Sequence, residues 1–357
     1  MMRSNSSTFD TTLLSLIFIY IGIGIIILYS GTDQNIPTLM RQLSRLSCGI
    51  FLMFMASLIN PRDLNEMGTV FFFLSIIILL AVYLFGSSGK GAQRWLDIGV
   101  IKFQPSEIVK LTLPLALASW LDFRTNTFTN HFISFSILAI PCLLILIQPD
   151  LGTAILIGST GLIMILISGL PSYMIAMCIG FAITAIPYAW FNILHDYQKA
   201  RIITFLNPGH DSMGAGYHII QSKIAIGSGG FAGKGWLNGT QSHLFFLPEH
   251  ATDFIFGIVG EEFGFIGTTF IILLILAITY RVLMIAHKID KPYERYVCCG
   301  LITNFFLGSI INIGMVIGIF PVVGVPLPLI SYGGTHAWIL LISLGIIFSM
   351  IRSYISR

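Results

Sequence analysis

Long apolar runs alternate with short polar segments along most of the chain. A helix needs about 20 apolar residues to cross the ~30 Å hydrocarbon core of a bilayer. Ten runs of about that length, bounded by charged or turn-forming residues, lie at 13–30, 43–59, 69–85, 106–120, 131–147, 150–168, 172–190, 264–283, 297–319 and 335–351. Several links between them are only two or three residues long, which makes consecutive helices antiparallel neighbours. The pattern predicts an all-α polytopic membrane protein with ten transmembrane helices in a single domain, residues 1–357.

One long polar segment interrupts this pattern. Residues 191–263 separate the seventh and eighth runs, are rich in glycine and contain the turn sequence Asn207-Pro208-Gly209. Short cytoplasmic loops of membrane proteins carry an excess of Lys and Arg. With a cytoplasmic N-terminus, the inner segments hold nine Lys and Arg residues against five in the short outer loops. We therefore expect both termini in the cytoplasm and residues 191–263 as one long extracytoplasmic loop between helices 7 and 8.

The composition excludes several classes of protein. Of the 357 residues, 55% are apolar and 10% are charged, whereas soluble domains are about 25% charged. So few charges cannot cover the surface of a soluble globule, and so many apolar residues exclude a disordered chain. The net charge of +3 is small and scattered, so we expect no nucleic acid partner.

Carboxylates in or beside membrane spans are costly and are therefore functional candidates. Glu107 and Lys110 are spaced i,i+3 on one helix face, which fits a structural ion pair as well as a substrate contact. Asp150 opens a span, where a carboxylate can cap free backbone N–H groups. Asp253 stands where the polar segment returns to apolar sequence. Partial desolvation there favours a general base, and helix capping is the alternative.

The cationic candidates lie outside the apolar runs. The glycine run at 227–235 lacks the GK[ST] ending of a nucleotide-binding loop, so we expect its N–H groups to face another anionic ligand. Lys234 and Arg201 add positive charge to the same segment. Arg94, beside Trp95, is either a membrane-interface anchor or a phosphate contact.

The prolines and glycines of residues 321–334 prevent a regular span at membrane depth. Such irregular backbone persists only where it is buried in protein or lines a cavity.

Several long motifs, in fixed order, carry a resemblance to a known family. They are WLDIG with FQPSEIVK (95–110), QPDLGTA (148–154), GYHIIQSKIAIGSGGFAGKGWLNGTQSHLFFLPE (216–249), TDFIFGIVGEEFGFIG (252–267) and NIGMVIGIFPVVGVPLPLISYGG (312–334). The chain resembles the SEDS (shape, elongation, division and sporulation) family, and GTQSHLFFLPE favours its elongation-specific RodA branch over the division-specific FtsW branch. Two departures stand out: Ala251, preceded by His250, replaces a common His, and Thr335-His336 follow SYGG in place of Ser and a small residue.

The resemblance implies a peptidoglycan glycosyltransferase that polymerises lipid II into glycan strands. By the same resemblance, Asp253 of the TDF motif is the catalytic aspartate. Its carboxylate deprotonates the acceptor hydroxyl while undecaprenyl pyrophosphate leaves the donor strand. The dianionic leaving group calls for positive charge. We expect it from a divalent cation (Mg²⁺ or Mn²⁺) or from the cationic residues of a substrate site formed by Glu107, Lys110, Arg94, Arg201 and Lys234.

The resemblance also implies partners and a location. Such proteins act with a class B penicillin-binding protein, the transpeptidase that cross-links new strands, and with the elongation machinery that maintains rod shape. The location is the bacterial cytoplasmic (inner) membrane, with the active site facing the exterior. A lipid II flippase is the main alternative, because broken backbone at depth also fits a transporter. A non-catalytic scaffold is a third reading, which Ala251 keeps open.

Overall fold

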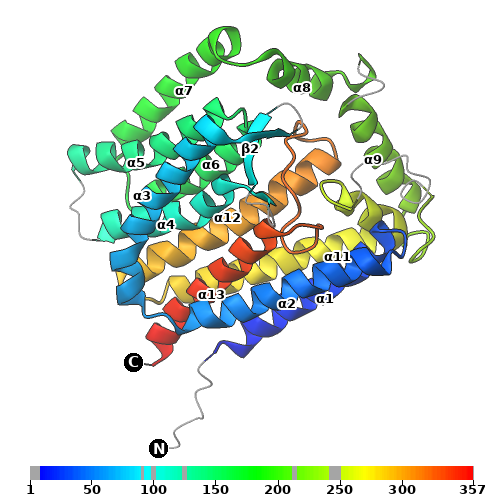
Figure 1. Cartoon of the computed structure of the whole chain (residues 1–357), viewed down its shortest axis with the longest axis horizontal. Coiled ribbons are helices and arrows are strands. Elements are labelled where there is room, and N and C mark those ends of the chain that lie inside the picture. Colours follow the sequence, from blue (N-terminus) through cyan, green and yellow to red (C-terminus); the bar gives the residue numbers. More distant parts are fainter. Residues whose placement is uncertain are drawn as a thin grey trace, which may run out of the picture.

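A computed structural model describes residues 9–89, 92–97, 102–122, 127–210, 215–240 and 251–356. Long helices make up most of this part of the chain (Figure 1). They are α1 (Thr11–Gly31), α2 (Ile36–Leu58), α3 (Pro61–Phe85), α4 (Pro105–Asp122), α5 (Phe128–Ile147), α6 (Leu151–Ile167), α7 (Ser172–Asn192), α11 (Ile255–Ala286), α12 (Pro292–Val316) and α13 (Thr335–Ile355). Each apolar run identified in the sequence coincides with one of them.

The helices confirm a membrane protein but not the full number of spans. In the part of the chain that the structure describes, seven helices are long and apolar enough to cross a bilayer: α1, α3, α5, α7, α11, α12 and α13. Helix α6 is apolar but has only 17 residues. Helices α2 and α4 contain charged side chains, among them Arg41 and Lys110. The expected ten spans therefore stay a prediction.

Local sequence explains where several helices begin. The side chains of Asp10 and Asn35 accept hydrogen bonds from the N–H groups of Leu13 (2.8 Å) and Thr38 (3.0 Å) at the starts of α1 and α2. These bonds satisfy backbone donors that a helix leaves free in its first turn.

Helix α12 forms the centre of the molecule. It packs against α4, α6, α11 and α13, and most of its side chains are buried. Helix α7 is the opposite case: within it only Met174 is buried, and it runs outward at the edge of the bundle (Figure 1). Helix α4 carries Glu107 and Lys110 and packs against α12, so these two buried side chains lie against protein rather than lipid.

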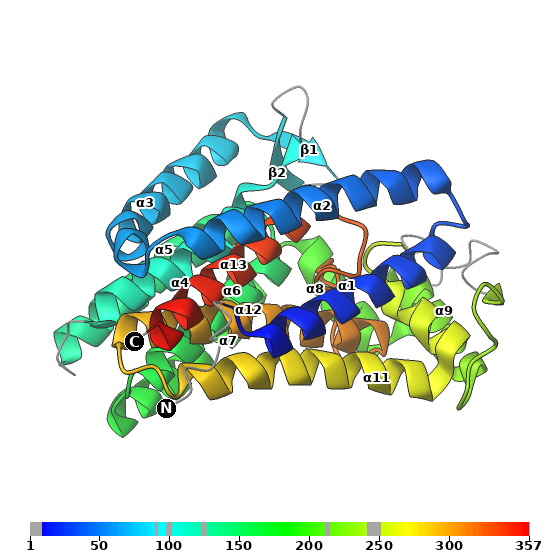
Figure 2. The same ribbon diagram turned by 90° about the horizontal axis from the view of Figure 1, so that it is seen from below.

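The two ends of the bundle carry different residues. At one end, Asp10 before α1 pairs with Arg281 near the end of α11 at 2.6 Å, and Arg352 near the end of α13 donates to the carbonyl of Leu58 at 3.0 Å. The start of α1 and the end of α13 thus lie at the same end of the bundle (Figure 1 and Figure 2). The starts of α4, α11 and α13 lie at the opposite end.

A small antiparallel sheet, which the sequence analysis did not predict, lies between α3 and α4. Its strands are β1 (Ser87–Gly89), β2 (Ala92–Asp97) and β3 (Lys102–Phe103), in the order β1-β2-β3. The expected all-α class is therefore correct for the bundle but not for this connection.

The segment 191–263 is more structured than the expected loop. Its described part contains α8 (Asp196–Leu206), a 3₁₀ turn (Pro208–His210), α9 (Ala215–Gly229) and the first turns of α11. The predicted start of the eighth span, residue 264, coincides with a break in α11, where Gly264 adopts a φ of +62°. Whether this segment is one loop outside the membrane stays a prediction.

Candidate functional site

Asp253 lies in the turn of residues 251–254 that leads into α11. The residue is partly buried, and the N-cap position of α11 is occupied by Phe254. Its carboxylate faces the irregular segment 321–334: a Cβ atom placed on Gly324 would stand 3.5 Å from Asp253 Oδ2. Gly324 has a φ of +72°, a conformation that favours glycine. The irregular segment thus forms one wall beside the candidate base.

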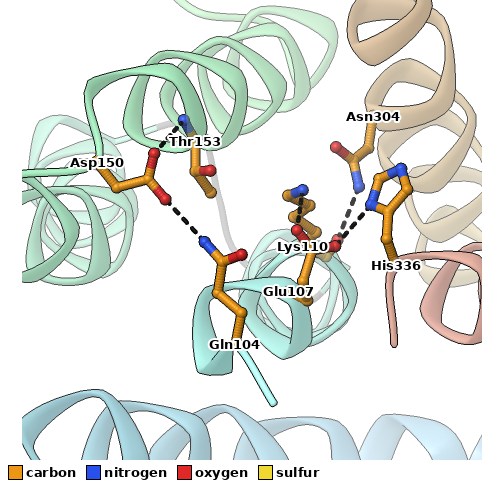
Figure 3. A network of polar contacts seen from close by, with 7 residues as sticks. All are labelled: Gln104, Glu107, Lys110, Asp150, Thr153, Asn304 and His336. Carbon is orange, nitrogen blue, oxygen red and sulfur yellow. Dashed lines mark hydrogen bonds and ion pairs between the residues drawn. The ribbon is translucent and has the colours of Figure 1, made fainter. Parts of the chain in front are cut away.

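Glu107, at the start of α4, contacts a lysine and a histidine. Its Oε1 pairs with Lys110 Nζ at 2.6 Å, and its Oε2 pairs with His336 Nδ1 at 2.8 Å (Figure 3). The side chains of Glu107 and Lys110 are only 7% and 3% exposed. The i,i+3 ion pair expected from the sequence is therefore present. His336, from the first turn of α13, binds the second carboxylate oxygen of Glu107.

Two buried polar atoms beside this trio have no partner among the described residues. They are His336 Nε2 and Asn304 Oδ1; the amide nitrogen of Asn304 donates to the Lys110 carbonyl at 3.4 Å. Because buried polar atoms normally find partners, these two atoms are available to water or to a substrate.

Asp150 has the capping role that the sequence predicted. Its Oδ1 accepts from the Thr153 N–H at 3.4 Å, and its Oδ2 accepts from Gln104 Nε2 at 2.9 Å (Figure 3). Gln104 immediately precedes α4, so this carboxylate also ties the start of α6 to the start of α4. The QPDLG and FQPSE motifs therefore meet at the same end of the bundle.

Lys234 is engaged in an internal ion pair. Its Nζ lies 2.7 Å from Glu261 Oε1 and 2.8 Å from the Thr240 hydroxyl. The backbone N–H groups of Lys234 and Gly235 donate to the carbonyls of Glu261 and Glu262, each at 3.0 Å. These contacts dock the glycine run onto the break in α11. Two of the N–H groups that were expected to face an anionic ligand are thus used inside the protein.

Glu262 is held on the other side of the same break. Its Oε1 accepts a hydrogen bond from the Ser30 hydroxyl of α1. Both carboxylates of the Glu261-Glu262 pair are therefore buried structural groups that join α1, α11 and the glycine run.

The other two predicted cations, Arg201 and Arg94, lie in different elements. Arg201 lies in α8, partly buried, and α8 packs against α9 and the 3₁₀ turn. Arg94 belongs to β2, but its side chain lies outside the described residues, as does His250. A cation that the sequence analysis did not single out, Arg45 of α2, lies 4.9 Å over the ring of Tyr332.

No group of three His, Cys, Asp or Glu side chains in the described ranges is placed to hold a metal ion. Glu107, which pairs with the candidate cation Lys110, also contacts His336. A divalent cation that accompanies the pyrophosphate stays a prediction.

Comparison with known proteins decides the family. A family model for FtsW, RodA and SpoVE, described as cell cycle protein, matches residues 5–354. The chain belongs to this family. The resemblance drawn from the motifs is thus confirmed.

Members of the family with curated names are similar over nearly the whole chain. Peptidoglycan glycosyltransferase MrdB of Escherichia coli K12 is 42% identical over 343 residues, which cover 96% of this chain and 93% of that protein. Peptidoglycan glycosyltransferase RodA of Treponema pallidum is 31% identical and covers 96% of this chain and 98% of its own length. The enzyme class implied by the motifs is the one in these names.

Solved structures of the family agree with the fold. A chain from a structural study of how a peptidoglycan synthase complex coordinates polymerization and crosslinking matches with a TM-score of 0.85 at 28% identity, covering 97% of this chain and 98% of its own. The crystal structure of Thermus thermophilus RodA matches with a TM-score of 0.74 at 24% identity, over 98% and 99% of the two chains.

Against this family background, His336 is the most informative residue that sequence reasoning missed. It had been noted only as a departure from the family's SYGG-Ser pattern, yet it binds Glu107. The other departure, Ala251, accepts a hydrogen bond from the Tyr332 N–H through its carbonyl at 2.9 Å. A backbone contact of this kind does not depend on which side chain stands at position 251.

Proposed function

We propose that this chain is the peptidoglycan glycosyltransferase that polymerises lipid II during cell elongation. The observation that carries the proposal is the gathering of Asp253, Glu107, Lys110 and His336 at one end of the bundle. The segment from Ser331 to His336 joins them, because it contacts the turn of Asp253 at its start and Glu107 at its end.

In the proposed reaction, Asp253 is the general base. Its carboxylate takes the proton from the C4 hydroxyl of the GlcNAc at the acceptor, lipid II. The freed oxygen attacks C1 of the MurNAc at the donor end of the growing strand. The bond from C1 to the pyrophosphate oxygen breaks, and undecaprenyl pyrophosphate leaves. A carboxylate suits this task because the leaving group is already activated and the base only has to accept one proton.

Positive charge would stabilise the leaving pyrophosphate. Lys110 is the best placed of the predicted cations, because it lies in the cluster, although it is shared with Glu107. Arg94, Arg201 and Lys234 stay candidates; Lys234 would have to exchange Glu261 for the substrate. Mg²⁺ or Mn²⁺ bound with the pyrophosphate is the remaining source.

We place the site on the outer side of the cytoplasmic (inner) membrane of a bacterium, in one domain of ten spans. Two observations support this orientation. The start of α1 and the end of α13 lie at one end of the bundle, where Arg281, Lys291 and Arg352 also lie. Basic residues mark the cytoplasmic side. The candidate site is at the opposite end, where the segment 191–263 leads into α11.

A class B penicillin-binding protein is the proposed partner. One similar structure comes from a complex that coordinates polymerization and crosslinking, and cross-linking needs a transpeptidase beside the polymerase. Lipid II and the nascent strand are the proposed substrates.

The flippase alternative is weaker on the same geometry. A flippase needs polar groups along the whole route through the bilayer, whereas the candidate residues gather at one end. A scaffold has no need for a buried Glu107–Lys110–His336 cluster, which costs desolvation energy.

The decisive experiment compares the wild type with Asp253→Asn. The purified chain, in complex with its class B penicillin-binding protein in detergent, receives labelled lipid II, and products are resolved on a gel. We expect polymer from the wild type and none above background from Asp253→Asn, with both complexes intact by size-exclusion chromatography. Polymer from both would exclude Asp253 as the base, and none from either would favour the flippase or the scaffold.

A further inference from the structure

Three consecutive backbone carbonyls of the turn that carries Asp253 are held by donors from elsewhere in the chain. The Ala251 carbonyl accepts from the Tyr332 N–H at 2.9 Å. The Thr252 carbonyl accepts from the Ser331 hydroxyl at 2.5 Å, and the Asp253 carbonyl from Asn312 Nδ2 at 2.8 Å. We call the three donors, Asn312, Ser331 and Tyr332, the carbonyl clamp.

The direction of the Ser331 hydrogen bond is fixed by a second contact. The N–H of Leu327 donates to the same oxygen, Ser331 Oγ, at 2.8 Å. An N–H can only donate, so the hydroxyl proton of Ser331 is left to bond the Thr252 carbonyl. The irregular segment 321–334 is thus closed on itself, and the Ser331 hydroxyl attaches it to the turn alongside the Tyr332 N–H.

The orientation of the Asn312 amide is fixed in the same way. Its nitrogen donates to the carbonyls of both Asp253 and Val325, each at 2.8 Å. If the amide were flipped, its oxygen would face two carbonyl oxygens, so this assignment follows from the network. The side chain of Asn312 is fully buried. One amide group therefore joins the C-terminal part of α12 to the turn and to the irregular segment.

These contacts restrain the backbone of the turn that carries Asp253. Residues 251–254 form a turn and not a helix, so their backbone would otherwise be free to move the Asp253 carboxylate. A misplacement of about 1 Å at a reacting group can cost a factor of ~100 in rate. Gly324, beside the carboxylate, belongs to the same segment as Ser331 and Tyr332 of the clamp.

We propose that Asn312 and Ser331 are positioning residues for the reaction: through the carbonyl clamp they hold the turn so that the Asp253 carboxylate meets the acceptor hydroxyl. The inference rests on the proposed function, because it assigns Asp253 as the base. Neither side chain touches the reacting atoms; both act through the backbone of residues 252 and 253.

The test measures polymerisation kinetics of the full complex with labelled lipid II. Ser331→Ala removes one oxygen, Ser331→Thr keeps the hydroxyl, and Asn312→Leu keeps the approximate volume without the donor. Ser343→Ala is the matched control, because Ser343 is also buried but its hydroxyl bonds the Ile339 carbonyl of its own helix. Rates are expressed per folded complex, counted by size-exclusion chromatography.

We expect kcat to fall at least about tenfold in Ser331→Ala and Asn312→Leu, with KM within about threefold, since a misplaced base slows the chemical step more than binding. Ser331→Thr should recover most of kcat, and Ser343→Ala should stay within about twofold of the wild type. Hydrogen exchange of the peptide 251–256 should become faster in Ser331→Ala and Asn312→Leu and stay unchanged in the other two variants.

Two results would overturn the inference. If Ser331→Ala keeps kcat within about twofold, the hydroxyl does not position the base. If its loss of activity equals its loss of folded complex, the residue is merely structural. In both cases an active wild type leaves the proposed function intact. A wild-type complex that makes no polymer removes the proposed function itself, and the positioning role with it.

Discussion

At the scale of single residues, contacts within one helical turn were predictable and contacts between helices were not. The Glu107–Lys110 pair follows from i,i+3 spacing, and the Asp150 cap from its place at the start of a span. His336 and Asn312 reach their partners across 229 and 59 residues of sequence. No local sequence pattern can predict contacts between residues so far apart in the chain. The only available signal for His336 was its departure from the family pattern.

The Glu107 cluster gives a prediction at this scale. Glu107→Gln leaves the Lys110 ammonium buried without its counter-charge, and breaking one side of a buried pair costs about 3–5 kcal/mol. We expect a drop of that order in the free energy of unfolding, measured by denaturation in detergent. His336→Ser keeps the Glu107–Lys110 pair and removes one charge-assisted bond, worth about 1.5–3 kcal/mol. An equal loss of unfolding free energy in both variants would show that the Glu107–Lys110 pair is not the main contribution of this cluster to stability.

At the scale of elements, the length of the apolar runs located the long helices and missed the short elements. Every predicted run became a helix, because length and hydropathy alone specify such segments. The strands β1 to β3 have two to six residues, and α8 is 11 residues long with a polar sequence. Their stability comes from neighbours in the fold, so the search for apolar runs could not detect them.

The junction between the glycine run and α11 gives the prediction at this scale. A Cβ on Gly233 would lie 2.1 Å from the backbone oxygen of Glu262, and Gly233 has a φ of +81°. Backbone atoms cannot move aside as a flexible side chain can, so Gly233→Ala should lower the melting temperature by many degrees. The control is Gly227→Ala: Gly227 lies in α9 with nothing within 4 Å of its Cβ position, and alanine there favours the helix by up to about 1 kcal/mol. Similar melting temperatures for the two variants would contradict the close approach.

At the scale of the whole molecule, the orientation in the membrane decides whether the proposed chemistry has access to its substrate. One end of the bundle holds the start of α1, the end of α13 and several basic residues, and the other end holds Asp253 and Glu107. The loop charges predict this polarity, and Arg281, Lys291 and Arg352, three of the residues behind that prediction, lie at the first end. Helices that cross the membrane determine which groups lie on the same side of the bilayer, and labelling in cells identifies that side.

Labelling in intact cells tests the orientation directly. In a variant whose five native cysteines are replaced, Asn238→Cys and Lys288→Cys each introduce one exposed thiol, the first near Lys234 and the second between α11 and α12 at the end where the chain terminates. If the site faces the exterior, a membrane-impermeant maleimide labels position 238 in intact spheroplasts, and position 288 only after lysis. The reverse pattern would put Asp253 on the cytoplasmic side. Pyrophosphate would then be released inside the cell, and extracytoplasmic strand synthesis by this site would be excluded. Equal labelling before and after lysis at both positions would show leaky spheroplasts, which a cytoplasmic marker protein detects independently.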